Sequence, residues 1–307
     1  MITDAFILFL SLVLIFYLSD LLTRSLSMFA KKLRINSFFL GTMLLALGTS
    51  FPELISATTA GILKVNQLSI GNLIGSNIVN TLLIIGVMAL IRPIRNIRKG
   101  EIKETIPIIL STILVLIFLM NGYLSRTEGI ILIISYFAYH YFMHKSKFFE
   151  GKIITKARIA KEMIVTPFTI FGIIISGYLV VSSSVFLAKS YGINLTLFGL
   201  TVVAIGTSMP ELATSIASSK NNNSKLGIGN IIGSNITNVL LILGITSVIN
   251  PINFTINTFI LVSWLFFFLS SLVLSIMMIN DKKISKNEGI FLLMSFVIYL
   301  TLIVMTR

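Results

Sequence analysis

Long apolar runs alternate with short polar segments along almost the whole chain. A helix that crosses the hydrocarbon core of a bilayer needs about 20 mostly apolar residues, and ten of the runs approach this length. The predicted spans cover residues 5–28, 37–62, 67–91, 105–122, 128–144, 162–188, 195–218, 226–249, 254–279 and 288–306. The pattern therefore predicts an all-α integral membrane protein with ten transmembrane helices.

The composition agrees with that pattern. Hydrophobic residues make up 55% of the 307 positions and charged residues only 11%, whereas an ordinary soluble domain carries about 25% charged residues. Too few polar residues remain to cover a soluble surface, so the lipid bilayer is the expected surrounding. The chain has no cysteine, which excludes disulfides, thiolate chemistry and iron–sulfur clusters, and no cofactor is expected.

The basic residues indicate how the chain lies in the cell membrane. The net charge is +13, which raises the question of a nucleic-acid partner. In so apolar a chain, however, an excess of Lys and Arg is typical of cytoplasmic loops. With ten spans, 20 of the 24 basic residues fall in segments on one side. This asymmetry predicts cytoplasmic basic loops, both termini outside, and no nucleic-acid partner.

The two halves of the chain repeat each other. Residues 41–93 match residues 199–251 at 24 of 53 ungapped positions, with a constant shift of 158 residues. Each copy contains five spans, so residues 1–144 and 162–307 are predicted to be two five-helix repeats joined by the basic linker 145–161. Because five is odd, the second repeat enters the membrane from the opposite side. Inverted-topology repeats are typical of transporters whose substrate site lies between the repeats, near the midplane.

Each repeat carries a carboxylate in the middle of an apolar span. The motif GTSxPEL occurs at 48–54 and at 206–212, and it places Glu53 and Glu211 at membrane depth. An ionisable residue there is costly, and by default it indicates function. A buried structural Glu is the alternative, but the duplicated position and the polar neighbours favour a cation site.

The residues around each Glu add further oxygen ligands. Pro52 and Pro210 lack the N–H group that would continue the helix, so they are expected to break it and to free carbonyl oxygens one turn earlier. Such backbone is tolerated at membrane depth only where protein, water or an ion satisfies it. Oxygen is the ligand that hard cations require. The hydroxyl side chains that share the face of the Glu are Thr49 and Ser50 in one repeat and Thr207 and Ser208 in the other.

A second motif, GNxxGSN, occurs at 71–77 and at 229–235. Its paired glycines permit close contact between helices. A serine in each motif and an asparagine four residues later can add oxygens to the same site. These residues are Ser76 and Asn80 in one repeat and Ser234 and Asn238 in the other.

Other polar features have a simpler interpretation. Six acids lie among basic loop residues and are expected to be solvated: Glu101, Glu104, Glu150, Glu162, Asp281 and Glu288. The chain contains neither a P-loop nor an EF-hand loop. An ATP-driven pump and an enzyme activity are therefore not expected.

The doubled motifs resemble the α-repeats of the cation/calcium antiporter superfamily, in particular prokaryotic sodium/calcium exchangers, over almost the whole chain. The resemblance implies a central core of spans two, three, seven and eight, across which spans one and six slide. It also implies that Glu53 and Glu211 bind Ca²⁺ and Na⁺ in turn, and that Thr49 and Thr207 offer carbonyl oxygens to Ca²⁺. Two flanking Na⁺ sites would comprise Ala46, Ser50 and Ser76, and Ala204, Ser208 and Ser234, with Asn80 and Asn238 in the middle.

The function predicted from these residues is exchange of Na⁺ for Ca²⁺ by alternating access. Two ionised Glu are neutralised by one Ca²⁺, whereas three Na⁺ leave one positive charge, so a ratio near 3:1 would be electrogenic. Protons are expected to compete for two close carboxylates. H⁺- or K⁺-coupled exchange stays open, although Asn at both central positions argues against K⁺. A cation channel and a non-transporting receptor are weaker alternatives, and the oligomeric state is open, a monomer included.

Overall fold

A computed structural model describes residues 2–32, 43, 45–95, 97, 102–144, 160–221, 223–280 and 282–306. Nearly all of these residues are helical. The predicted linker 145–161 lies almost entirely outside the described residues, as does the start of the predicted span 37–62. The predicted all-α class is confirmed by the helical content and by the apolar helices.

The helices fall into two series. The first series is α1 (Ile2–Lys32), α3 (Ala46–Thr49), α4 (Phe51–Ile62), α5 (Asn66–Ile78), η2 (Val79–Ile84), α6 (Ile85–Ile91), α8 (Thr105–Leu119) and α9 (Arg126–His144). The second is α10 (Ala160–Ser190), α11 (Leu195–Phe198), η3 (Gly199–Val203), α12 (Ala204–Thr207), α13 (Met209–Lys220), α14 (Ser224–Ile236), η4 (Thr237–Ile242), α15 (Leu243–Ile249), α16 (Thr258–Asn280) and α17 (Lys286–Met305). The three η segments are π-helical turns inside longer helices.

Six helices in the described part of the chain are long and apolar enough to cross a membrane alone. A seventh crossing is formed if α11–α12 and α13, which are bent by 41° at a short break, are counted as one span. The helix α8 is shorter, with 15 residues. Fewer helices therefore meet this criterion than the ten spans predicted from the sequence.

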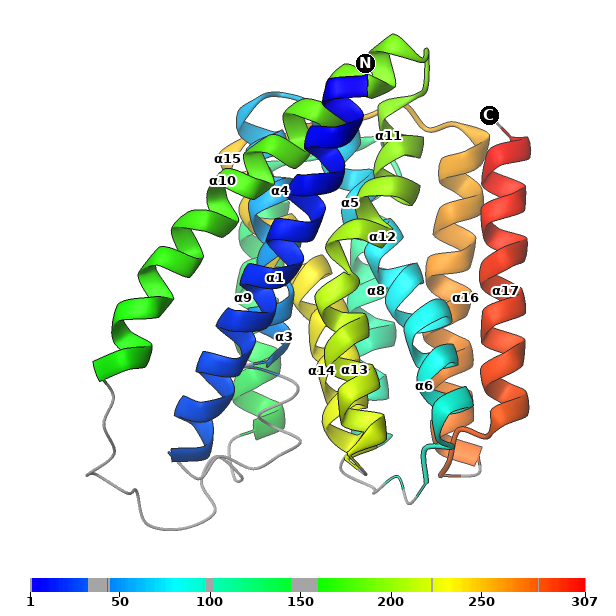
Figure 1. The fold of residues 1–307 in the computed structure, drawn as a ribbon. Coiled ribbons are helices and arrows are strands. Elements are labelled where there is room, and N and C mark those ends of the chain that lie inside the picture. The colour runs from blue at the N-terminus through cyan, green and yellow to red at the C-terminus, as the bar shows by residue number, and fades with distance from the viewer. Residues whose placement is uncertain are drawn as a thin grey trace.

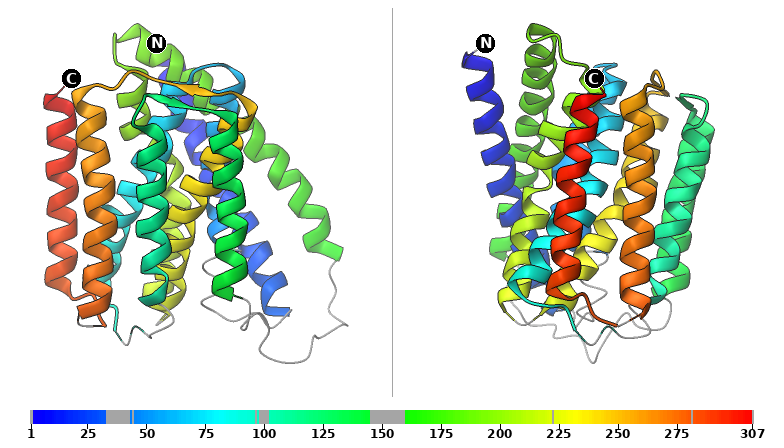
Figure 2. Two further views of the ribbon diagram at one scale, coloured as in Figure 1. Left: turned by 180° about the vertical axis from the view of Figure 1, so that it is seen from behind. Right: turned by 90° about the vertical axis from the view of Figure 1, so that its right-hand side faces the viewer.

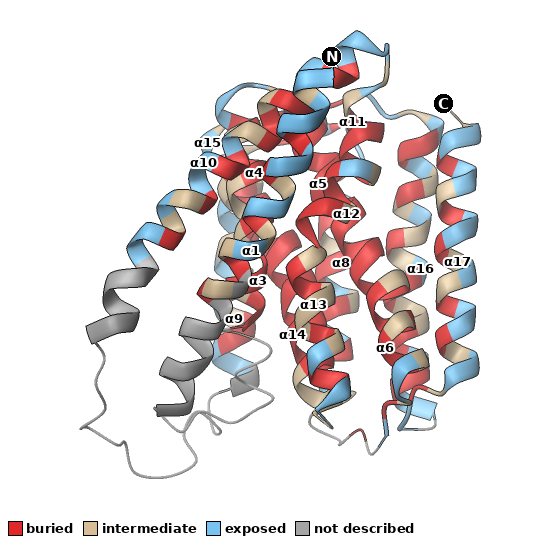
Figure 3. Cartoon of the chain, in the orientation of Figure 1, coloured by how far each residue is buried: buried red, intermediate tan, exposed pale blue. Residues whose placement is uncertain are grey.

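The helices form a bundle in which α1 and α10 lie at one edge and α16 and α17 at the other (Figure 1). The outer helices α1 and α10 have 31 residues each and pack along one another. Between the edges, α5 and α14 are buried almost throughout (Figure 3). Apolar side chains of α16 and α17 are exposed on the outside, as expected for helices that face lipid.

Short extended segments join the two halves at opposite ends of the bundle. The strands β1 (Tyr123–Leu124) and β2 (Ile252–Asn253) pair antiparallel, at the end that carries both termini (Figure 2). At the other end, Ile94 pairs with Ile284 in an antiparallel bridge. Leu124 and Ile284 occupy equivalent positions in the two halves, because each directly precedes the serine of a capping box. Ile94 and Ile252 are equivalent as well, since the shift of 158 residues relates them. Equivalent segments of the two halves therefore make equivalent contacts.

Two glycines allow α5 to lie directly against the helix that begins at Leu195. A Cβ added at Gly71 would lie 2.3 Å from the carbonyl oxygen of Thr196, and one at Gly75 would lie 2.6 Å from that of Leu200. Real Cβ atoms do not approach backbone oxygens this closely, so both positions need glycine. The predicted role of this glycine pair in close helix packing is confirmed.

The prediction for Glu104 is wrong. Its side chain is only 2% exposed, and its Oε2 accepts a hydrogen bond of 2.7 Å from the hydroxyl of Tyr139 on α9. The neighbours in the sequence are basic and polar, but the fold places Tyr139 over the carboxylate. Sequence neighbours alone therefore gave no sign of this burial.

Candidate cation site

Each of two helices is interrupted next to a carboxylate. The first interruption is at Ser50, between α3 and α4, and the second is at Ser208, between α12 and α13. The two serines have nearly the same backbone angles, with φ of −84° and −82° and ψ of 8° and 6°. Pro52 and Pro210 lie in the first turn of the helix that follows. Proline is favoured there because its missing N–H group has no helical partner in any case.

The carboxylates of Glu53 and Glu211 lie in the first turns of α4 and α13 and are 0% exposed. A helix N-terminus favours negative charge, because its unpaired N–H groups point toward the carboxylate. Both helices therefore begin at the point where the sequence supplies an acid. The site lies in the buried centre of the bundle (Figure 3).

Serine hydroxyls connect each carboxylate to both halves of the chain. Ser76 donates a hydrogen bond of 3.4 Å to Oε1 of Glu53, and Ser208 from the other half donates one of 3.2 Å to the same atom. Oε1 of Glu211 is held in the same way, by Ser234 at 3.2 Å and by Ser50 at 3.1 Å. Each carboxylate thus receives one hydroxyl from its own repeat and one from the other.

The threonines of the GTSxPEL motifs also bond across the halves. The Thr49 hydroxyl donates to Oδ1 of Asn230 at 3.3 Å, and the Thr207 hydroxyl donates to Oδ1 of Asn72 at 3.1 Å. Asn72 and Asn230 are not among the site residues predicted from the sequence. Both are the first asparagine of the GNxxGSN motif, so their repetition was the signal that could have found them.

The central asparagines lie at the start of the π-helical segments. Asn80 is in η2 and Asn238 is in η4, and both are fully buried. The segment η2 contacts α13, which carries Glu211, while η4 contacts α4, which carries Glu53. π-Helical turns are rare in proteins, but those that occur are often found at functional sites. Here both copies of the turn lie next to the carboxylates.

Several buried oxygens of this site accept no hydrogen bond within the described part of the chain. They are Oε2 of Glu53, Oε2 of Glu211, Oδ1 of Asn80 and Oδ1 of Asn238. A buried polar atom without a partner costs roughly 1–3 kcal/mol. Carboxylate and amide oxygens are the ligands that hard cations such as Ca²⁺ take in proteins. The donor set therefore fits a cation that supplies the missing partner.

The alanines predicted to line the flanking sites are fully buried one turn before the interruptions. The carbonyl oxygen of Ala46 accepts a hydrogen bond from the Ser50 amide at 2.9 Å, and that of Ala204 accepts one from the Ser208 amide at 3.1 Å. A carbonyl oxygen has two lone pairs. The hydroxyls of Thr49 and Thr207 also lie within reach of these oxygens, at 3.4 Å and 3.5 Å. Both hydroxyls have a closer acceptor in an asparagine of the other half, and while they donate there the second lone pair of each carbonyl can face an ion.

The acids in this cluster are few. Among the described residues there is no group of three or more His, Cys, Asp or Glu side chains that could hold a metal ion. Affinity for Ca²⁺ rises with the number of charged ligands and with the rigidity of the site. Two carboxylates with neutral oxygens therefore suit an ion that binds and leaves again.

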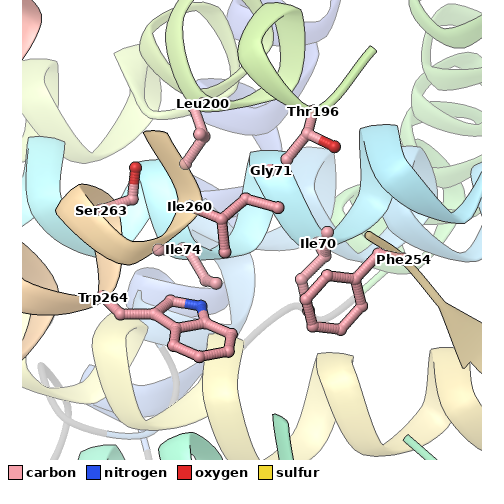
Figure 4. Close-up of a pocket in the computed structure, with 9 residues that line it drawn as sticks. All are labelled: Ile70, Gly71, Ile74, Thr196, Leu200, Phe254, Ile260, Ser263 and Trp264. Atoms are coloured by element: carbon pink, nitrogen blue, oxygen red, sulfur yellow. The ribbon is translucent and has the colours of Figure 1, made fainter. Parts of the chain in front are cut away.

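A pocket elsewhere in the bundle does not have this chemistry. It lies between α5, the α11–η3 segment and α16 (Figure 4). Its lining is almost entirely apolar and includes Ile70, Ile74 and Trp264. No carboxylate faces it, so it does not compete with the buried cluster as a cation site.

Comparison with known proteins gives a consistent result. The family described as sodium/calcium exchanger protein matches residues 3–145 and residues 163–305, so the two halves match it separately. The sodium/calcium exchanger MaX1 of Methanosarcina acetivorans is 31% identical, with 97% of each chain covered. The putative antiporter CaxA of Alkalimonas amylolytica is also 31% identical, with 94% of each chain covered.

A solved structure has the same fold. The sodium–calcium exchanger NCX_Mj, soaked with 10 mM Na⁺ and 10 mM Sr²⁺, superposes with a TM-score of 0.75. It is 27% identical in sequence, and the match covers 98% of both chains. The similarity therefore extends over the outer helices as well as over the buried cluster.

Proposed function

The chain belongs to the sodium/calcium exchanger protein family, which it matches in both halves, and we propose that it exchanges Na⁺ for Ca²⁺ by alternating access. It is an integral membrane antiporter that carries these two cations. The coupling, the stoichiometry and the ligands are the proposal. The observation that carries it is the crossed cluster in which Ser50 bonds to Glu211 and Ser208 bonds to Glu53.

The proposed ligands are the oxygens that surround this cluster. Glu53 and Glu211 bind Ca²⁺ and Na⁺ in turn, with backbone carbonyls of Thr49 and Thr207 added for Ca²⁺. The two flanking Na⁺ sites and the middle position use Ala46, Ser50, Ser76, Ala204, Ser208, Ser234, Asn80 and Asn238. The crossed hydrogen bonds support this assignment, because any movement of one half relative to the other must change the surroundings of both carboxylates.

The charge of the site supports exchange at a ratio near 3 Na⁺ to 1 Ca²⁺. Two ionised carboxylates are neutralised by one Ca²⁺, whereas three Na⁺ leave one positive charge in the site. In the empty site, two negative charges would remain buried at membrane depth, which is costly. The empty site therefore resists the transition, and transport in one direction is coupled to transport in the other.

The proposed architecture is ten spans in two inverted five-helix repeats, residues 1–144 and 162–307, with the linker 145–161. The equivalent contacts at opposite ends of the bundle support it, since β1 pairs with β2 at one end and Ile94 with Ile284 at the other. The side of the basic loops is proposed to be cytoplasmic. Both described ends of the chain lie at the opposite side of the bundle (Figure 1), as an even number of crossings requires. All proposed ligands come from one chain, so a monomer suffices.

The test is uptake of radiolabelled Ca²⁺ by proteoliposomes loaded with Na⁺. Uptake is expected only while Na⁺ is higher inside than outside. A K⁺ gradient or a pH gradient imposed without the Na⁺ gradient should drive none. Uptake that follows the pH gradient, or that proceeds with no counter-ion, would reject the Na⁺ coupling in favour of proton coupling or a channel.

The ligands are tested in the same assay. Glu53→Gln and Glu211→Gln should each abolish uptake, because one charge of the pair is lost while the shape is kept. Glu128→Gln is the matched control, since Glu128 caps α9 far along the chain from either motif, and Gln can keep a capping box. Near-normal uptake by either site variant would refute the central carboxylate pair.

A further inference from the structure

A hydrogen-bonded chain of three side chains holds one of the two central asparagines. Nδ2 of Asn80 donates to Oδ1 of Asn235 at 3.1 Å, and Nδ2 of Asn235 donates to the hydroxyl of Thr81 at 2.8 Å. All three residues are buried. The chain crosses between the halves twice, since Asn235 belongs to the second repeat and the other two residues to the first.

The equivalent chain is absent from the other side of the site. The shift of 158 residues converts Asn80, Asn235 and Thr81 to Asn238, Asn77 and Val239. Val239 has no hydroxyl to accept from Asn77. The amide nitrogen and oxygen of Asn77 and of Asn238 are all buried without a hydrogen-bond partner, as far as the described residues extend.

The two central asparagines are therefore held differently, although both are asparagine. Nδ2 of Asn80 is committed to Asn235, which leaves its Oδ1 as the atom without a partner. The side-chain amide of Asn80 is therefore held in one orientation, with its oxygen free to bind an ion. For Asn238 neither amide atom is committed, so the group can turn.

We propose that Thr81 is a positioning residue that fixes Asn80 through Asn235, so that Asn80 offers a preset oxygen to the ion while Asn238 adjusts to the ion that is bound. This inference rests on the proposed function, in which both asparagines face the transported cations. A preset ligand binds more tightly because its side chain need not be ordered on binding. Ca²⁺ takes six to eight oxygen ligands, so the loss of one preset oxygen should weaken Ca²⁺ binding in particular.

The test compares three variants of the full chain. Thr81→Val removes the hydroxyl at nearly constant shape, Thr81→Ser restores it, and Val239→Ala changes the equivalent position where no hydrogen bond exists. The Ca²⁺ concentration for half-maximal uptake should rise about three-fold or more in Thr81→Val, with the Na⁺ dependence and the maximal rate within about two-fold of wild type. Thr81→Ser and Val239→Ala should keep the wild-type Ca²⁺ dependence.

A further variant and a second measurement keep the test decisive if Thr81→Val folds poorly. Should Thr81→Val not yield stable protein, Thr81→Ala lacks the same hydroxyl and should give the same shift. The thermal stabilisation of detergent-solubilised protein by added Ca²⁺ should also need more Ca²⁺ in the variant without the hydroxyl. An equal change in Thr81→Val and Val239→Ala, or no recovery in Thr81→Ser, would overturn the positioning role.

The proposed function can fail separately from this inference. Wild-type protein without Na⁺-driven uptake would reject the exchange reaction, whatever Thr81 does. Wild-type protein with Na⁺-driven uptake, together with an unchanged Ca²⁺ dependence in Thr81→Val, would reject only the role of Thr81.

Discussion

Ser50 donates a hydrogen bond of 3.1 Å to Oε1 of Glu211, which lies 161 positions further along the chain. The equivalent hydrogen bond joins Ser208 to Glu53 at 3.2 Å, across 155 positions. Each interrupted helix thus places its serine beside the carboxylate of the other. A relative movement of the two halves cannot leave either carboxylate unchanged, which is the coupling that an alternating-access antiporter needs.

Removal of the Ser50 hydroxyl should weaken Na⁺ binding. Ser50→Ala removes a proposed Na⁺ ligand, together with one of the two hydroxyls that donate to Oε1 of Glu211 among the described residues. We take the lost contact between the hydroxyl oxygen and Na⁺ to match the low end of a hydrogen bond to a charged group, about 1.5 kcal/mol, so the Na⁺ concentration that half-inhibits Ca²⁺ uptake should rise roughly ten-fold. Competition of Na⁺ against radiolabelled Ca²⁺ at the outer face measures this shift.

Thr58→Val is the matched control for that experiment. Thr58 lies on α4, the helix that follows Ser50, and among the described residues its hydroxyl donates to the backbone carbonyls of Leu54 and Ile55 and to no side chain. Its loss should leave the Na⁺ dependence unchanged. A similar shift in both variants would mean that the effect comes from α4 and not from the carboxylate.

The residues that the sequence proposes as ligands lie together in the fold, but the sequence did not predict the hydrogen bonds that connect them. Duplicated motifs singled out Glu53 and Glu211 as proposed ligands, because an acid at equivalent positions of two apolar spans is by default functional. They did not identify the partners of Thr49 and Thr207, because Asn72 and Thr207 are 135 positions apart. The packing of the helices decides which side chains of one half contact those of the other, and no local motif predicts these contacts.

The same reason explains what was missed outside the site. Glu104 lies in a segment of basic residues, and only the fold shows that Tyr139 covers it. The hydropathy pattern predicted all-helical membrane structure correctly, because long apolar runs have few alternatives. It could not predict the π-helical turn at Val79–Ile84, whereas the break at Ser50 agrees with the interruption expected from Pro52.

A methyl group at Gly71 should destabilise the protein. An added Cβ would meet the Thr196 carbonyl oxygen at 2.3 Å, and backbone cannot give way as a flexible side chain can. Overpacking of this kind costs about 1–3 kcal/mol, so Gly71→Ala should lower the melting temperature in detergent. Gly61→Ala is the control, since its nearest contact is a side-chain methyl of Thr246 at 3.1 Å. Equal melting temperatures for the two variants would contradict the close approach of α5 and α11.

The buried carboxyl of Glu104 should make stability depend on pH. Burial raises the pKa of Glu104 from 4.5 to about 7, although the hydrogen bond from Tyr139 acts in the opposite direction. Between these values the folded protein holds a proton that the unfolded chain has lost. Stability should therefore fall as the pH rises toward 7, by up to about 3 kcal/mol, and then level off.

Two variants check the origin of that dependence. Glu104→Gln cannot titrate, so its melting temperature should fall less between about pH 5 and about pH 7 than that of wild type. Tyr139→Phe removes a hydrogen bond that lowers the pKa of Glu104, so its decline should continue to a higher pH. An unchanged pH profile in Glu104→Gln would show that other groups cause it.

Exchange at 3 Na⁺ to 1 Ca²⁺ should respond to voltage, because each cycle moves one positive charge. In Na⁺-loaded vesicles that charge leaves with Na⁺, so an interior-negative potential should oppose Ca²⁺ uptake. The opposition is about 2.3 kcal/mol per cycle for 100 mV, which lowers the Ca²⁺ accumulation ratio at equilibrium about fifty-fold. A K⁺ diffusion potential set with valinomycin supplies the voltage, and the same K⁺ gradient without valinomycin is the control. If K⁺ alone changes the uptake, K⁺ is coupled to transport. If the voltage changes nothing, the ratio is 2:1, because the two Na⁺ would then carry the same charge as the Ca²⁺ that replaces them between Glu53 and Glu211.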